Sequence, residues 1–168
     1  MKEIQSEVDE NLILLEDGEA FAKHARQIVE QGRRELAILS SSLDPYIYDR
    51  TDFADLVSSL ARGDRKAEVR IQVKDIRPLV ERGHRLLKLA RRLSSKVHIR
   101  KLLIEPENDT RAYLIGDRGL LLYKHDDTEY KGFANYRAGP EANALLDVFN
   151  HLWEQHSTVD PSLRNLRI

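Results

Sequence analysis

The chain has 168 residues, no cysteine and a net charge of −1, and 41% of its residues are hydrophobic and 33% charged. This length is close to the common size of a single domain and is sufficient to bury a core. The balanced charge excludes a strong overall attraction to nucleic acid or acidic membranes, and the lack of cysteine excludes disulfides and thiolate metal sites. The apolar run near the N-terminus is too short for a signal peptide or membrane span, so we expect a cytoplasmic protein.

Short apolar segments alternate with amphipathic ones along the first half of the chain. Leu12–Leu15 predicts a strand, and residues 17–32 place their apolar side chains on one helical face. Residues 35–40 (ELAILS) predict a buried strand that leads into a serine-rich loop. Residues 51–63 predict a second helix, because their apolar positions follow the spacing i, i+3, i+4, i+7.

The second half continues this alternation and then changes character. Residues 67–74 predict a strand with one polar face, residues 78–93 an amphipathic helix, and residues 97–103 another strand. Residues 111–135 predict three strands joined by a tight turn and a hairpin loop. A long helix follows, with Pro140 in its first turn.

This order of elements predicts an α/β fold. Helices between strands form βαβ units, so we expect a mixed, largely parallel sheet with helices on both faces, and the closing hairpin adds antiparallel strands. The sequence shows neither an internal repeat nor a linker. It predicts one domain over residues 1–156 and a C-terminal tail over residues 157–168, which lack helical periodicity and contain Pro161.

The segment from Arg111 to Trp153 consists mainly of the stretches RAYLIGD, GLLLYKHDDTEYKGFANYR and GPEANALLDVFNHLWEQH, the last of which continues to His156. It resembles the C-terminal half of a phospholipase D-like domain, whose active members carry His-x-Lys-x4-Asp followed by a Gly-Ser-x-Asn-like element. The stretches LDPYIYD, VKD, GHRLLKLARRLSS and FNHLWEQ also look like a bacterial domain of this fold that occurs alone or appended to acetyltransferases. That second resemblance implies neither substrate nor reaction.

The resemblance implies the fold without its nucleophile. Asp117 matches the motif carboxylate and Asn135 the motif asparagine. The histidine and lysine positions hold Thr110 and Ala112 or, with a one-residue slip, Arg111 and Tyr113. Single-half members of the superfamily dimerise to complete the two-half arrangement, so the resemblance also implies a homodimer.

Charge is concentrated locally. Residues 82–104 contain eight Lys or Arg and no acid, whereas residues 1–20 contain seven acids and one Lys. Such a basic segment is suited to binding phosphate groups, which can belong to free phosphate, to nucleotides or to a nucleic-acid backbone. The predicted ligand-binding residues are three on one helical ridge and one on the next strand: Arg85, Lys88, Arg92 and Arg100. The alternative is a solvated face that pairs with the acidic N-terminus, within one chain or across a dimer.

Three polar residues follow predicted strand ends or begin the charged helix: Asp44, Asp75 and His84. Ligands collect at the carboxyl ends of strands in open α/β sheets, and an Asp can orient a His that acts as base or nucleophile. The alternative is that Asp44 starts a turn, Asp75 caps a helix and His84 lies on the surface.

No sequence motif for a metal or cofactor is present. The sequence lacks a Walker loop, a nucleophile elbow and a dinucleotide fingerprint, and His125-Asp126-Asp127 fits a hairpin turn better than a metal site. We therefore predict no metal and no cofactor. The predicted function is a non-catalytic phospholipase D-like domain that binds an anionic ligand or partner. The alternative is a divergent hydrolase or phosphotransferase that uses His84 with Asp75.

Overall fold

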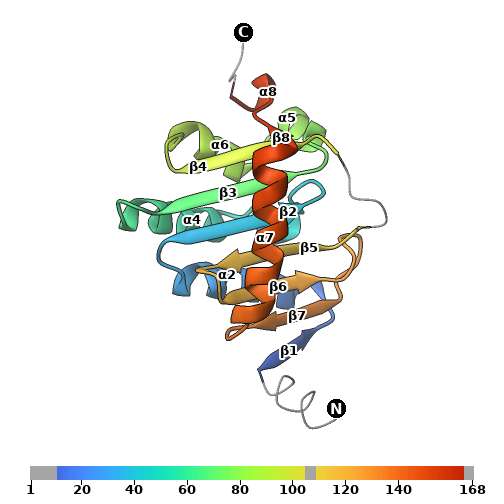
Figure 1. The fold of residues 1–168 in the computed structure, drawn as a ribbon. Helices are drawn as coiled ribbons and strands as arrows, with labels where there is room; N and C mark the ends of the chain where they lie inside the picture. The colour runs from blue at the N-terminus through green and yellow to red at the C-terminus, as the bar shows by residue number, and fades with distance from the viewer. Residues whose placement is uncertain (1–10, 105–108, 165–168) are drawn as a thin grey trace.

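A computed structural model describes residues 11–104 and 109–164 of the chain, as a central sheet covered by helices (Figure 1). The strand order across the sheet is β1-β7-β6-β5-β2-β3-β4-β8. The strands are β1 (Leu12–Leu15), β2 (Glu35–Ser40), β3 (Glu68–Val73), β4 (Val97–Leu102), β5 (Ala112–Gly116), β6 (Leu120–Lys124), β7 (Gly132–Asn135) and β8 (Ser157–Thr158). The helices are α2 (Gly18–Gln31), α3 (Pro45–Tyr48), α4 (Thr51–Gly63), α5 (Arg77–Arg82), α6 (Arg85–Arg92), α7 (Gly139–Gln155) and α8 (Pro161–Arg164).

The sheet is mixed, as predicted, but it is largely antiparallel, and the prediction of a largely parallel sheet was wrong. Only the pairs β2–β3 and β3–β4 are parallel among the described strands. The other neighbouring pairs are antiparallel. The physical reason is that helical crossovers bring consecutive strands side by side only between β2 and β4. Strands β5 to β7 are joined by short turns, which can connect only antiparallel neighbours.

The sheet separates two hydrophobic cores. On one face, helices α2, α4 and α6 pack over apolar side chains such as Ile38, Ile71 and Ile99. On the other face, α7 runs across the strands (Figure 1) and buries Phe149 and Trp153 against the sheet. Helices therefore cover both faces, as the sequence predicted.

Residues 78–93 form two helices and not the single helix that their periodicity predicts. Gly83 interrupts the chain with φ of 81°, a left-handed conformation that glycine adopts without strain. His84 then takes an extended conformation and caps α6, where its Nδ1 accepts a hydrogen bond from the Leu86 amide. This break changes the direction of the chain just before the basic residues.

Gly132 begins β7 at a point where two strands approach closely. A Cβ atom at this position would collide with the backbone carbonyl of Tyr123 on β6. The glycine of the GFAN segment is therefore required by strand packing, independently of any chemistry.

Residues 157–164 of the predicted tail pack on the domain. Strand β8 pairs with the end of β4, and α8 places the Leu163 side chain in the core. Residues 165–168 and the first half of the acidic segment, residues 1–10, lie outside the described residues. Within the described ranges, no helix is long and apolar enough to cross a membrane.

Candidate nucleic-acid interface

His84 is buried, and both of its ring nitrogens are engaged. Besides the cap to Leu86, Nε2 lies 3.1 Å from the Leu43 carbonyl, to which it donates because Nδ1 is the acceptor. A carboxylate oxygen of Asp49 lies 4.0 Å from Nδ1. Burial lowers the pKa of His84, and the negative charge of Asp49 opposes this shift only in part. The ring is thus a neutral helix cap with no free nitrogen directed at a ligand.

Asp75 and Asp44 are committed to other partners. Asp75 accepts hydrogen bonds from the Arg77 amide and guanidinium, and the latter holds the pKa of the carboxyl below its usual value. Asp44 accepts from the Tyr46 amide at the start of α3, and its second oxygen accepts from the Tyr130 hydroxyl at 2.6 Å. In the described part of the chain, no contact joins His84 to either carboxylate.

Asp44 instead borders a buried ionic network that the sequence did not reveal. The ammonium of Lys124, on β6, donates to the backbone and carboxylate oxygens of Asp127 at 2.9 and 3.1 Å. It lies 3.8 Å from Asp44 Oδ2, and only 6% of its side chain is exposed. Asp127 also accepts from the Ser41 amide at 2.6 Å. The network fastens the loop after β2 to the β6–β7 hairpin, so it is structural.

The two residues that match the phospholipase D-like motif also make structural hydrogen bonds. Asp117 lies in the turn between β5 and β6 with φ of 47°. Its carboxylate accepts three backbone hydrogen bonds from the segment that begins β2, donated by Arg33, Arg34 and Glu35. Asn135 accepts from the Arg137 amide and thereby shapes the approach to α7.

Three of the four predicted ligand-binding residues share the outer surface of α6: Arg85, Lys88 and Arg92. Their side chains are exposed because the opposite side of the helix buries Leu86, Leu87 and Leu89. Arg85 is held by Asp49, with Nη1 3.1 Å from the carboxylate. The side chains of Lys88 and Arg92 have no hydrogen-bond or ionic partner among the residues that the structure covers. We refer to Arg85, Lys88 and Arg92 as the α6 ridge.

Arg100 does not join the α6 ridge. It projects from β4 toward α7, on the other face of the sheet, where Nη1 donates to the Trp153 carbonyl at 2.7 Å. Its guanidinium carbon lies 4.3 Å from the centre of the Trp153 ring, which is a cation–π contact. Strand alternation explains this separation, since Val97 and Ile99 occupy the side that faces α6.

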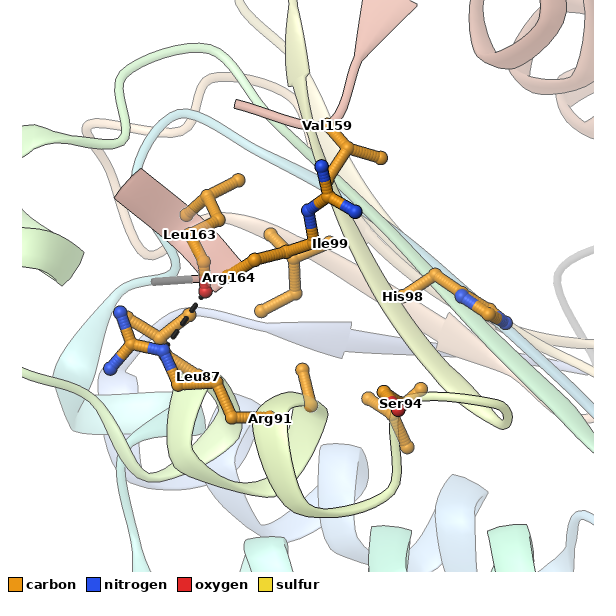
Figure 2. A pocket seen from close by; sticks show the side chains of 10 residues that line it. Leu87, Arg91, Ser94, His98, Ile99, Val159, Leu163 and Arg164 are labelled. Carbon is orange, nitrogen blue, oxygen red and sulfur yellow. Dashed lines mark hydrogen bonds between the residues drawn. The ribbon is translucent and has the colours of Figure 1, made fainter. Parts of the chain in front are cut away.

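A groove of about 520 Å³ lies beside the α6 ridge, between α6, β4 and the C-terminal segment (Figure 2). Leu87, Ile99 and Leu163 contribute apolar side chains to it. Arg91 lines one side, but its Nε donates to the Leu163 carbonyl at 2.9 Å, as the dashed line shows. Arg91 therefore anchors α8 and does not extend the ridge.

The family described as Domain of unknown function (DUF7931) matches residues 17–166. The chain belongs to this family. No curated protein matches the chain.

Two solved structures share the fold at low sequence identity. One is TrmBL2, described as an archaeal chromatin protein with a novel mode of DNA binding, with a TM-score of 0.62 and 13% identity. The match covers 87% of this chain and 53% of TrmBL2, so the chain spans about half the length of that protein. The other is NucT from Helicobacter pylori, with a TM-score of 0.58, 11% identity, and coverage of 86% of this chain and 95% of NucT. At such identities the likeness shows a related fold.

Proposed function

We propose that this domain has a phospholipase D-like fold and binds the phosphate backbone of nucleic acid through the α6 ridge, without catalysing a reaction. The observation that carries the proposal is that Lys88 and Arg92 are exposed and lack acidic partners in the described part of the chain. The fold shared with TrmBL2, which is described as binding DNA, supports this choice of anion. Homodimerisation remains a prediction.

The ridge is suited to backbone contact and not to reading sequence. Arg85, Lys88 and Arg92 follow one another along the exposed side of two helical turns, and none of the three belongs to an aromatic cluster that could stack on bases. Lysine and arginine contacts to phosphate fix the position of a protein on nucleic acid but carry no sequence information. Each such contact releases a counterion, so binding should weaken steeply as salt rises.

The test measures binding of fluorescently labelled duplex DNA by anisotropy over a range of salt concentrations. The Lys88→Ala/Arg92→Ala variant should weaken binding and reduce the slope of log K against log salt by about 1.8, because each duplex phosphate contact contributes about 0.9. The matched control is Lys23→Ala/Arg137→Ala, which removes the same charge from exposed positions on α2 and before α7. Equal slopes in the two double variants, or no binding by the unmodified protein, would overturn the proposal.

A further inference from the structure

A cluster of aromatic rings lies on the α7 face of the sheet, away from the α6 ridge. Tyr123 and Phe133 are directly opposite each other on β6 and β7, and their rings stack with centroids 5.1 Å apart and an interplanar angle of 19°. The exposed His125 meets Tyr123 edge-on at 5.3 Å. Both stacked rings are only half-buried. On β1, the residue opposite Phe133 is Leu14, which is 75% exposed, so this corner of the sheet is open to solvent.

A cation stands at one end of this cluster. The Arg111 side chain, about a third exposed, precedes β5, and its Nε donates to the Asp109 carboxylate at 3.1 Å. The guanidinium also interacts electrostatically with the hydroxyl groups of Tyr123 and Tyr113. Asp109 thus holds a positive charge whose field reaches the stacked Tyr123 ring.

The cluster also contains an unused donor. Tyr113 is opposite Tyr123 in the register of β5 and β6, and it is 2% exposed. Its hydroxyl has no hydrogen-bond partner within the described residues. Burial raises the pKa of Tyr113, so the hydroxyl keeps its proton at neutral pH. A buried hydroxyl without a partner is energetically unfavourable, which points to a group that pairs with it when a ligand binds.

We propose that Tyr113, Tyr123, Phe133, His125 and Arg111 form a nucleotide site, in which an unpaired base stacks on the accessible rings of Tyr123, Phe133 and His125 and its phosphate contacts Arg111. The buried Tyr113 supplies a hydroxyl donor. The site uses the chemistry of single-strand binding, in which every base offers a π-face to aromatic rings while cations hold the backbone. Bases inside a duplex are not available for such stacking. The ligand is a free nucleotide or a nucleotide within a single strand. This inference does not rest on the α6 ridge, which lies on the other face of the sheet.

The test uses three probes: adenosine monophosphate, a labelled ten-nucleotide oligo-deoxyadenylate, and the same oligonucleotide with abasic sites. The Tyr123→Leu/Phe133→Leu variant keeps apolar volume in the sheet but removes the stacking surface. It should weaken binding of the base-containing probes by about 5- to 150-fold, the range for one stacked base. The control is Tyr46→Leu, a half-exposed aromatic residue on α3, and should change nothing. Arg111→Gln, which leaves the rings in place, tests the phosphate contact separately.

The results distinguish a free nucleotide from a single strand as the ligand, and the aromatic cluster from the α6 ridge as the binding surface. Equal sensitivity of the mononucleotide and the oligonucleotide to Tyr123→Leu/Phe133→Leu supports a free nucleotide as the ligand. Sensitivity of the oligonucleotide alone supports a single strand. The site is overturned if the abasic oligonucleotide binds as tightly as the intact one, or if neither the leucine variant nor Arg111→Gln weakens binding. The site is also overturned if only Lys88→Ala/Arg92→Ala weakens binding, a result that leaves the proposed function standing.

Discussion

Replacing Lys124 with methionine should destabilise the domain more than its position near the end of a strand suggests. Methionine preserves most of the side-chain volume but leaves Asp127 and Asp44 without their cation. Breaking a buried ion pair by removing one partner costs about 3–5 kcal/mol, because the remaining charge is buried without compensation. Asp127 is 9% exposed but Asp44 is 21% exposed, so water can reach part of the network. We therefore expect a loss of about 3 kcal/mol.

Urea unfolding and thermal melting measure this loss directly. For a domain of this size each kcal/mol shifts the melting temperature by about 2–4 °C, so Lys124→Met should melt about 6–12 °C lower. Lys88→Met is the matched control and should stay within about 0.5 kcal/mol, because the Lys88 side chain is exposed and unpaired among the described residues. Adding Asp127→Asn to Lys124→Met should recover part of the loss by removing an uncompensated charge. A loss below about 1 kcal/mol, or no recovery in the double variant, would refute this account of the network.

Three further predictions follow from individual contacts. Burial holds the folded-state pKa of His84 below its ordinary 6.5, so below pH 6.5 the unfolded chain binds more protons and stability should fall on acidification, by at most about 1.4 kcal/mol per pH unit. His84→Asn keeps a capping acceptor but removes the titrating ring, so the free energy of unfolding should depend less on pH below 6.5. Urea unfolding at several pH values measures this dependence, and an unchanged slope would mean that His84 does not cause it. Tyr113→Phe removes an unpaired buried hydroxyl, so it should leave stability unchanged or raise it by about 1 kcal/mol, and a clear loss would mean that the hydroxyl is paired in solution. Gly132→Ala should disrupt the pairing of β7 with β6, because the new Cβ would collide with the Tyr123 carbonyl. The melting temperature should therefore fall strongly, and an unchanged melting temperature would show that the strand can shift to make room.

Local periodicity was sufficient to locate most elements. The helix predicted at residues 51–63 is α4, and the strand predicted at residues 35–40 is β2. The prediction of a largely parallel sheet was wrong because strand pairing depends on which strands meet in space. Here β5 pairs with β2, from which it is far apart in the sequence. The break at Gly83 was missed because the apolar stripe of residues 78–93 continues across it, although a glycine next to a capping residue is a detectable signal.

The candidate site was harder to predict than the fold. Three ridge positions came together because helical spacing fixes them, as it does for Arg85, Lys88 and Arg92. Arg100 was separated from them by strand alternation, which the sequence does contain but which requires knowing the face that each helix covers. Lys124 and Asp127 are only three residues apart in one hairpin, but the approach of Asp44 to Lys124 depends on a second loop that meets this hairpin in space, and nothing in the local sequence specifies that contact.

The structure separates the residues that the fold needs from those that it does not. Asp117, Asn135 and Gly132 coincide with a catalytic signature, yet each is explained by backbone hydrogen bonds or close strand packing. A chain can therefore keep all three for structural reasons alone, and their presence is no evidence of activity. Function is better sought where a side chain makes no contribution to the fold or opposes it. The Lys88 ammonium and the Tyr113 hydroxyl meet this criterion on opposite faces of the sheet. The first is exposed and the second is buried, and neither group has a hydrogen-bond partner among the described residues.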